Sequence, residues 1–362
     1  MTDSGAPRPQ QPHPGASRQP EPDTPLPGAA HPDSPRIDAP RSATPAADES
    51  ATDVQRRADS HPAALKLVVA INPSASFGRT AGVGAKVVAA LRADGHTVEE
   101  LIATDFETLK MAARAAVAEH PDALVVVGGD GMVSLGVNLV AETPTPLGII
   151  PSGTGNDAAL GLGIPFDLDK AVDALRAALR RPARVIDLGR VTRLAGGATD
   201  SLYFASALSA GFDALVNERA NAMRRPRGAS RYTIALLLEL LRLRARSYEL
   251  VVDGTPRTVK SVLLAVSNNR SIGGGMLITP DARLDDGALD LLIVAPVSRL
   301  KFLRLFPRVF KGTHAGLPIV ELSRVRSVRL DAPDIVAYAD GERVGPLPVE
   351  VTIVPGALRV LA

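Results

Sequence analysis

Residues 124–131 read Leu-Val-Val-Val-Gly-Gly-Asp-Gly, and residues 147–157 read Leu-Gly-Ile-Ile-Pro-Ser-Gly-Thr-Gly-Asn-Asp. Each stretch is an apolar run followed by a glycine-rich turn, and each turn carries an aspartate, Asp130 or Asp157. Glycine lets a backbone approach a ligand closely, and a loop that enters a helix directs free N–H groups at an anion. Because the nearby carboxylates suit a divalent cation, the two turns predict a nucleotide bound with magnesium, and hence phosphoryl transfer.

The first 62 residues differ in composition from the rest. They contain 13 prolines and carry six arginines against nine acidic residues, a net charge of −3. Such a segment buries too little apolar surface to offset the entropy of ordering, so we expect a disordered tail over 1–62. Since the whole chain carries +2, residues 63–362 carry +5, which suits an anionic ligand or a membrane surface. This excess is too small to indicate nucleic acid binding, and 3% aromatic residues offer few stacking platforms for single strands.

The chain contains no cysteine, which excludes disulfides and thiolate metal sites and is compatible with a reducing compartment. Residues 1–60 lack the apolar core of a signal peptide, and no apolar run is long enough for a membrane-spanning helix. We therefore expect a cytoplasmic protein, in peripheral contact at most with the inner face of the membrane.

Strands and helices are expected to alternate in the first part of the folded region. Apolar runs predict strands at 65–71, 97–102, 123–127 and 147–150, and the segments between them predict helices at about 82–92, 106–119 and 133–141. This order predicts an open, mainly parallel α/β sheet over 63–185. Ligands of such sheets bind beyond the carboxyl ends of the strands, where Asn72 and both glycine turns are expected to lie.

A β-rich second domain is expected over residues 186–350. Strand-like runs occur at 183–191, 203–210, 247–252, 261–267, 289–294, 325–331, 335–339 and 349–354, and Asp-Gly pairs separate several of them. Two helical insertions are expected near 213–246 and 298–310. Residues 351–362 are expected to return to the first domain as a final strand.

The motifs together resemble the diacylglycerol kinase catalytic-domain family, in particular the soluble bacterial lipid kinases, which are also similar to sphingosine kinases. Besides the two glycine turns, the resemblance includes Asn72-Pro73 with Ser74 and Ser76, the stretch from Asn268 to Asp290, and Asp340-Gly341-Glu342. It covers roughly residues 63–362. NAD kinases share only the Gly-Gly-Asp-Gly element, and the second glycine turn argues against a NAD kinase.

The resemblance implies a role for each matching residue. Glu342 would accept the proton of the lipid hydroxyl group, and Asp130 and Asp157 would organise the catalytic Mg²⁺. The residues implied in ATP binding are Asn72, Pro73, Ser74, Ser76, Thr104, Gly128, Gly129, Asp130, Gly131, Ser134, Gly153, Thr154, Gly155 and Asn156. The resemblance also implies a structural Mg²⁺ held by Asp286 and by the carbonyl groups of Arg283 and Ala288, although Asp286-Gly287 alone is an ordinary turn signal.

Two residues of the first turn depart from the family pattern. Met132 and Ser134 stand where the family usually has threonine and asparagine, and Met132 removes a hydroxyl donor near the phosphates. This change would weaken nucleotide binding, select an unusual substrate or mark an impaired enzyme. Since Asp130, Asp157 and Glu342 are all present, we expect an active enzyme.

Residues 298–311 form a basic amphipathic segment. On a helix, Lys301, Arg304, Arg308 and Lys311 share one face, Phe302, Phe306, Val309 and Phe310 lie largely opposite, and Pro307 should kink or shorten the helix. The segment suits either an anionic membrane surface or an ordinary surface helix whose apolar face packs in the core. A second basic cluster precedes Tyr232 and comprises Arg224, Arg225, Arg227 and Arg231.

We expect an ATP- and Mg²⁺-dependent lipid kinase that acts on diacylglycerol, with a sphingoid base or another glycerolipid as alternatives. A kinase of a small molecule such as NAD, or a catalytically impaired nucleotide- or lipid-binding protein, is a further alternative. The sequence leaves the oligomeric state open, and a homodimer is one candidate.

Overall fold

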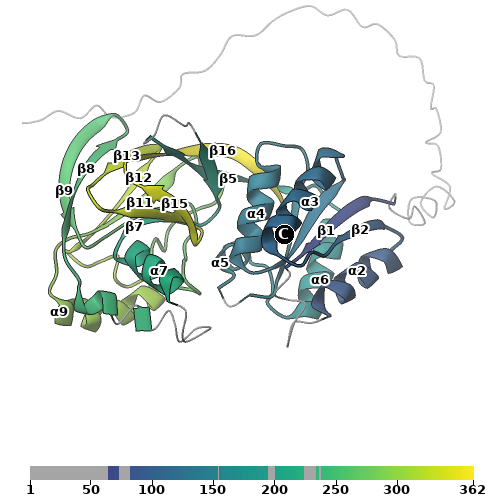
Figure 1. The fold of residues 1–362 in the computed structure, drawn as a ribbon, viewed down its shortest axis with the longest axis horizontal. Helices are drawn as coiled ribbons and strands as arrows, with labels where there is room; N and C mark the ends of the chain where they lie inside the picture. Colours follow the sequence, from purple (N-terminus) through teal and green to yellow (C-terminus); the bar gives the residue numbers. More distant parts are fainter. Residues whose placement is uncertain (1–63, 73–81, 154, 195–199, 224–233, 236–237) are drawn as a thin grey trace, which may run out of the picture. The chain divides into compact units, whose positions relative to one another are not determined.

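A computed structural model describes residues 64–72, 82–153, 155–194, 200–223, 234–235 and 238–362. The predicted tail over 1–62 and the basic cluster at 224–231 lie outside the described residues. The folded region has an α/β lobe followed by a β-rich lobe, which confirms the predicted fold class (Figure 1). None of the helices in the described part of the chain is long and apolar enough to cross a membrane.

The α/β lobe is built on four parallel strands. They are β1 (Lys66–Ile71), β2 (Thr97–Leu101), β3 (Ala123–Gly128) and β4 (Leu147–Pro151), in the order β2-β1-β3-β4. Strands β3 and β4 are buried at every position, as their continuous apolar runs predict. The four strands confirm the predicted parallel sheet.

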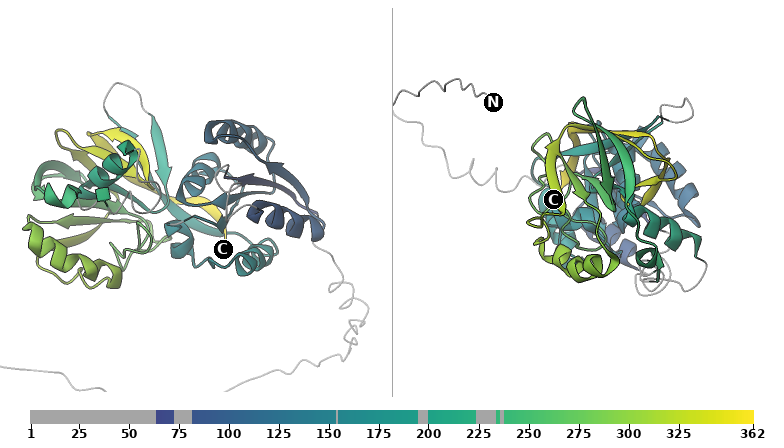
Figure 2. Two further views of the ribbon diagram at one scale, coloured as in Figure 1. Left: turned by 60° about the horizontal axis from the view of Figure 1, so that its bottom comes forward. Right: turned by 90° about the vertical axis from the view of Figure 1, so that its left-hand side faces the viewer.

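Helices cover both faces of this sheet (Figure 2, left). They are α2 (Val83–Ala93), α3 (Phe106–Ala118), α4 (Asp130–Val140), α5 (Asp157–Leu162) and α6 (Leu168–Ala178). Helices α2 and α6 share one apolar core beneath the sheet, whereas α3 and α4 share the core on the other face. Layers of this kind place the strand ends, and the loops that follow them, at one edge.

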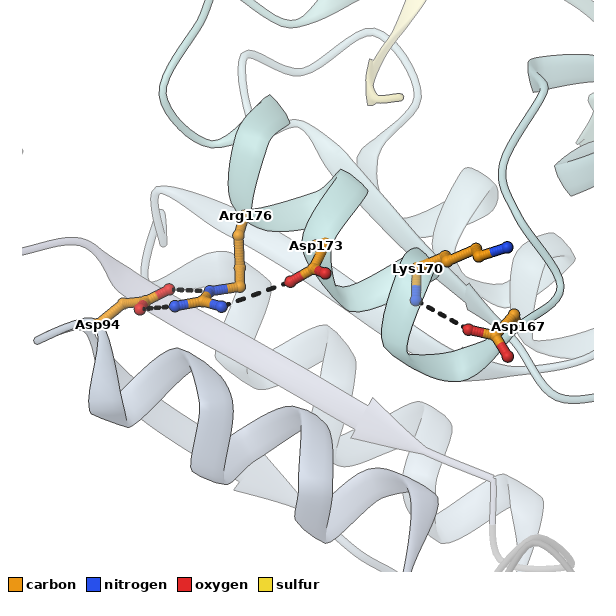
Figure 3. Close-up of polar contacts among 5 residues, drawn as sticks. All are labelled: Asp94, Asp167, Lys170, Asp173 and Arg176. Carbon is orange, nitrogen blue, oxygen red and sulfur yellow. Dashed lines mark hydrogen bonds and ion pairs between the residues drawn. The ribbon is translucent and has the colours of Figure 1, made fainter.

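An arginine joins α2 to α6 (Figure 3). Arg176 Nε donates to Asp94 Oδ2 at 2.5 Å, and a second bond of the same guanidinium completes a two-pronged ion pair. Because these bonds favour the ionised carboxylate, they hold the pKa of Asp94 below its usual range. Asp167 caps the first turn of α6 by accepting the Lys170 N–H at 3.1 Å.

The β-rich lobe is a sandwich of antiparallel strands. The six-stranded sheet has the order β12-β11-β10-β7-β14-β15. Its strands are β7 (Ala207–Gly211), β10 (Leu263–Ser267), β11 (Leu289–Val294), β12 (Val320–Val325), β14 (Val336–Ala339) and β15 (Glu342–Pro346). The facing strands are β5 (Arg184–Arg193), β6 (Ser201–Phe204), β8 (Arg246–Val252), β9 (Thr255–Ser261), β13 (Ser327–Asp331) and β16 (Val349–Leu361). One apolar core fills the space between them.

Strand β16 belongs to both lobes. It pairs antiparallel with β5 and β13, and near its end Val360 pairs with Leu147 of β4 in parallel register. The parallel sheet of the first lobe therefore continues, through one strand, into the sandwich of the second.

Two predicted strands are each two strands in the structure. The run at 203–210 is broken between β6 and β7 at Ala205-Ser206, and the run at 325–331 divides into β12 and β13, which belong to different sheets. Helices of this lobe within the described ranges include α7 (Phe212–Ala222), α9 (Arg299–Leu305) and the 3-10 helix η2 (Phe306–Lys311). Helix α9 ends directly before the turn that contains Pro307, as predicted.

Candidate active site

The two glycine turns lie backbone against backbone. A Cβ atom added to Gly153 would lie 2.4 Å from the Cα atom of Gly129, and one added to Gly129 would lie 3.1 Å from the Cα atom of Gly153. The Ser152 N–H also donates to the Gly128 carbonyl at 2.9 Å. Because backbone atoms cannot move aside as a flexible side chain can, this contact requires glycine on both sides.

Helix α4 starts inside the first glycine turn. It begins at Asp130, three residues earlier than the predicted start near 133, so the turn itself supplies the N-terminal N–H groups. The Asp130 carboxylate accepts the N–H groups of Asn156 at 2.9 Å and Asp157 at 2.8 Å. Asp130 thus caps the next helix, α5. Burial, and then the neighbouring Asp157 charge, raise the pKa of Asp130, while the N–H donors oppose that rise.

The second turn is held by its own asparagine. Asn156 has a left-handed backbone with φ of 57°. Its Oδ1 atom accepts the Gly153 N–H at 3.2 Å and its Nδ2 group donates to the Gly153 carbonyl at 2.8 Å. Asparagine tolerates this conformation better than most residues, and its amide here fixes the turn in which Gly153 meets Gly129.

Asp157 joins the second turn to the β-rich lobe. Its carboxylate accepts the Gly274 N–H at 3.1 Å and the Gly275 N–H at 3.2 Å, and its backbone carbonyl accepts Asn269 Nδ2 at 2.8 Å. The side chain is 7% exposed. These contacts bring Gly274 and Gly275, which belong to the matching stretch from Asn268 to Asp290, to the second glycine turn, and they give Asp157 a positioning role that the sequence did not indicate.

Glu342 lies beside the first turn of α4. A Cβ atom on Gly131 would be 3.5 Å from Glu342 Oε1. The residue is exposed by area, yet protein atoms displace enough water from around its carboxyl group to raise the pKa of Glu342; Lys110 opposes this rise and Glu107 adds to it. The predicted proton acceptor and the predicted phosphate loop thus meet, although more than two hundred residues separate them.

Asp340 fixes the turn that carries Glu342. Its carboxylate accepts three backbone N–H groups, those of Ala205 at 2.7 Å, Ser206 at 2.9 Å and Ala207 at 3.0 Å. These donors interrupt the strand predicted over 203–210, because they bond to a side chain instead of a neighbouring strand. Burial raises the pKa of Asp340 to about 6 against the effect of the N–H donors, and the Asp130 charge adds to the rise.

The remaining predicted nucleotide residues lie at different depths. Asn72 follows β1 and donates its N–H to the Val127 carbonyl at 3.1 Å, which places it at the carboxyl end of the sheet. Thr104 is exposed and bonds to Asp105, the cap of α3. Ser134 is buried within α4. Gly155 lies against Asp130, because a Cβ atom there would be 2.1 Å from Asp130 Oδ2. Pro73, Ser74, Ser76 and Thr154 lie outside the described residues.

Met132 points into the core. It is 1% exposed and belongs to the apolar core shared with α3, and its Cγ atom lies against Gly128. The expectation that Met132 removes a donor at the phosphates is therefore not supported by its position. The side chain packs beneath the turn, where its volume supports Gly128.

Asp286, the side chain predicted to hold a structural metal, forms an ion pair with an arginine. Asp286 Oδ2 lies 2.5 Å from Arg324 Nη2, and Asp286 Oδ1 accepts the Ala288 N–H at 3.3 Å. Burial, followed by the Asp286 charge, raises the pKa of the adjacent Asp290 to about 6. Within the described residues no group of three or more His, Cys, Asp or Glu side chains is placed to hold a metal ion. A cation bound by Asp286 and the carbonyls of Arg283 and Ala288 would thus compete with the Arg324 guanidinium.

Sequence reasoning placed two polar residues in motifs but assigned them no role in the site. Ser152 Oγ and Asn268 Oδ1 are buried and have no hydrogen-bond partner among the described residues. Asn268 donates through Nδ2 to the Asp187 and Ala205 carbonyls, next to the loop that Asp340 holds. Ser152 lies within the second glycine turn, so its place in the motif is the signal that could have identified it.

Comparison with known proteins places this site in a family. A model of the diacylglycerol kinase catalytic domain matches residues 66–191, and a model of the YegS C-terminal NAD kinase beta sandwich-like domain matches residues 206–362. A diacylglycerol kinase of Mycobacterium tuberculosis is 42% identical over 297 residues, which cover 82% of this chain and 94% of that protein. The chain belongs to the diacylglycerol kinase family.

Other members of the diacylglycerol kinase family agree with this assignment. A diacylglycerol kinase of Bacillus subtilis is 30% identical over 245 residues, which cover 66% of this chain and 77% of that protein. The crystal structure of a diacylglycerol kinase from Bacillus anthracis has the same fold, with a TM-score of 0.61 at 19% identity over 82% of this chain and 96% of that one. Membership confirms the predicted resemblance and makes this protein a lipid kinase, a phosphotransferase with an alcohol group as acceptor.

Proposed function

We propose that the protein transfers the γ-phosphoryl group of ATP, with Mg²⁺, to the primary hydroxyl group of diacylglycerol, giving phosphatidic acid. The observation that carries this proposal is the meeting of Glu342 with Gly131 in the first turn of α4. Phosphoryl transfer depends on positioning and on charge neutralisation, so a phosphate loop and a proton acceptor side by side suit it.

The nucleotide fits the two glycine turns. In the first turn of α4 the Met132 N–H donates to the Gly129 carbonyl at 2.9 Å, and the N–H groups of Asp130 and Gly131 precede this bond at the helix N-terminus, a position that favours an anion. The hydroxyl of Ser152, which is buried and has no hydrogen-bond partner within the described ranges, adds a donor in the facing turn. We assign phosphate binding to Gly128, Gly129, Gly131 and Ser152. Asn72, Pro73, Ser74, Ser76, Thr104, Ser134, Gly153, Thr154, Gly155 and Asn156 complete the proposed nucleotide site on the basis of the resemblance.

The carboxylate of Asp130 suits Mg²⁺. Each of its oxygens accepts one N–H bond and retains further lone pairs for a hard cation. Bound Mg²⁺ would neutralise charge on the ATP phosphates. Asp157 keeps its positioning role, since its oxygens hold the loop at Gly274 and Gly275. The second Mg²⁺, at Asp286, remains a proposal that requires Arg324 to move aside.

Glu342 is proposed as the general base. The lipid hydroxyl oxygen forms a bond to the γ-phosphorus as the bond to the leaving ADP oxygen breaks, and the hydroxyl proton passes to the Glu342 carboxylate. A raised pKa makes this carboxylate a better proton acceptor at neutral pH, because general base catalysis is most effective near the working pH.

An apolar cavity in the β-rich lobe suits the lipid. It measures about 100 Å³ and lies between the six-stranded sheet and the α9–η2 segment, with Ile272 and Met276 among its lining residues. These two residues flank the Gly273–Gly275 loop that Asp157 holds, so the cavity and the nucleotide loops share one segment. His314 is the one polar side chain among its lining residues, and its Nδ1 atom has no partner among the described residues. The cavity holds only part of an acyl chain unless α9–η2 moves.

The α9–η2 segment is proposed to contact the membrane. Phe302, Phe306 and Val309 line the cavity, as the predicted apolar face requires, but no residue of α9 is buried. Leu300 is 80% exposed and Phe310 51% exposed. With Lys301, Arg304, Arg308 and Lys311 beside them, these side chains form the mixed basic and apolar surface that anionic membranes bind.

The test uses labelled ATP with a panel of diacylglycerol, sphingosine and NAD. We expect labelled phosphatidic acid, and no product from Glu342→Gln even though its affinity for ATP stays nearly unchanged. Glu350→Gln is the matched control, because Glu350 is an exposed glutamate of the same lobe. Labelled NADP, or wild-type turnover by Glu342→Gln, would refute the proposal.

A further inference from the structure

A second pocket, away from the glycine turns, is lined by arginines. It measures about 380 Å³, within the range of small-molecule sites, and its charged lining residues are Arg219, Arg242, Arg244, Arg246 and Glu239. The remaining lining residues are Gly211, Phe212, Leu215, Leu243 and Val262. We call this site the arginine pocket.

The charges of the arginine pocket favour an anion. Arg219 Nε donates to Glu239 Oε1, and the Glu239 side chain is 8% exposed, so this ion pair is part of the wall. Among the residues that the structure describes, no carboxylate pairs with Arg242, Arg244 or Arg246. Within the described part of the chain, these three guanidinium groups therefore have no carboxylate partner. Guanidinium groups bind phosphate through two parallel N–H bonds, which suits this lining to a phosphate group.

The surroundings of the arginine pocket are apolar. Phe212 lines both this pocket and the apolar cavity, and its ring packs against Phe302 of α9 with ring centroids 5.1 Å apart. Leu241, next to Arg242 in sequence, is 65% exposed, and Leu238 is 37% exposed. Helices α7 and α9 also lie beneath the strands of this lobe in the view of Figure 1. A phosphate group attached to acyl chains matches this combination better than a fully hydrated anion.

We infer that the arginine pocket binds the phosphate group of an anionic phospholipid, as a site separate from the acceptor site. Strand β7 contacts the two sites at opposite ends. Asp340, in the turn that carries Glu342, bonds to Ala207 at the start of β7, whereas Gly211 at its end lines the arginine pocket. A lipid bound there is therefore not the molecule being phosphorylated. It anchors the lobe to a membrane that already contains phosphorylated lipid.

The inference goes beyond the proposed function and is tested without ATP. The full-length protein is titrated with phosphatidylcholine vesicles that contain or lack phosphatidate. The variant combines Arg242→Gln with Arg244→Gln. Its matched control combines Arg326→Gln with Arg329→Gln, two exposed arginines of the same lobe that lie outside the pocket lining.

We expect phosphatidate to strengthen vesicle binding by the wild type and by the control. Each basic residue near an anionic surface contributes about fivefold in affinity, so the pocket variant, which loses two, should bind about twenty-five-fold more weakly. Equal losses in the two double variants would overturn the inference, because they would show a diffuse charge effect. A charge reversal, Arg244→Glu, provides a second variant, and unchanged melting temperatures show that each variant folds.

Inorganic phosphate and glycerol 3-phosphate distinguish the source of the phosphate group. If the ligand is a lipid, neither soluble anion raises the melting temperature of the wild type at concentrations where vesicles bind. If either anion stabilises the wild type but not the pocket variant, and vesicles do not bind, the lipid assignment is wrong and the pocket is a site for a soluble phosphate.

Discussion

The contact between the two glycine turns makes a quantitative prediction for Gly153→Ala. The new Cβ atom would lie 2.4 Å from Gly129 Cα, whereas ordinary contacts begin at 3.4 Å. The turns must therefore separate by about 1 Å. The closest neighbour is backbone, and the next, Asn156 Oδ1 at 3.0 Å, is tied to the turn by the Gly153 N–H, so the displacement falls on the backbone that carries Asp130 and Asn156.

A displacement of this size should reduce catalysis more than stability. Misplacing reacting groups by about 1 Å costs on the order of a hundredfold in rate. Forcing an extra methyl group into a packed site costs roughly 1–3 kcal/mol in the free energy of unfolding. We expect kcat/KM for ATP to fall about a hundredfold, while the protein remains folded by circular dichroism and thermal melting.

Two other glycines provide controls. A Cβ atom at Gly316 would meet nothing within 4 Å, so Gly316→Ala should leave kcat/KM and stability unchanged. A Cβ atom at Gly131 would meet Glu342 Oε1 at 3.5 Å, an ordinary contact, so Gly131→Ala should fold normally. The expectation for Gly153→Ala is a loss of about a hundredfold in kcat/KM. If kcat/KM instead stays within about a factor of three of the wild type, the close approach of Gly153 to Gly129 does not serve the reaction and the reasoning is wrong.

Three further predictions concern charge. Arg176→Leu should lower the melting temperature at pH 7. The pKa of Asp94 is depressed in the folded state, so the stabilisation from this pair is present above the pKa that Asp94 has in the unfolded chain and is lost as pH falls through its pKa in the folded state. The melting temperatures of the wild type and the variant should therefore converge in acid. Asp290→Asn should have the opposite pH dependence. The pKa of Asp290 is raised to about 6 from 3.8, so ionised Asp290 destabilises the folded state fully above about pH 6 and not below pH 3.8. The substitution should therefore raise the free energy of unfolding by roughly 1–3 kcal/mol at pH 7 and by little at pH 3.5. In the same thermal melts, added Mg²⁺ should stabilise the wild type and not Asp286→Asn; no difference between them would exclude a metal at that position.

The sequence was sufficient to predict the parallel half of the fold. Strands β3 and β4 are buried on both faces, and a strand buried in this way has apolar residues at nearly every position, so the unbroken apolar runs were enough to predict them. Helix α6 was not predicted, although the cap at Asp167 and its amphipathic spacing were present in the sequence. Strand β9 lies at the edge of its sheet and consists mostly of polar residues. It therefore has no apolar run from which a strand could be predicted.

The breaks in the second lobe could not be predicted from local sequence. The run at 203–210 is mostly apolar and has no glycine or proline to mark a break, yet Ala205 and Ser206 leave the ladder because a carboxylate 134 or 135 residues away binds their N–H groups. Likewise, Val325 and Ser327 are almost adjacent in the chain but belong to different sheets. In both places the conformation depends on a partner far away in the sequence. Hydrophobic periodicity and turn residues describe only the local sequence, so they could not predict these breaks.

The acidic residues of the site divide into two kinds. Asp130, Asp157 and Asp340 each bind backbone N–H groups of a loop other than their own, so each carboxylate fixes one loop against another. Among the described residues, no hydrogen bond holds the carboxylate of Glu342 in this way. At the three aspartates, a proton on a carboxylate oxygen would compete with an N–H bond that holds one loop against another. Glu342, fixed by its turn but free at its carboxylate, is the acidic group of this site that can take a proton without releasing a loop, and this difference argues for it as the base.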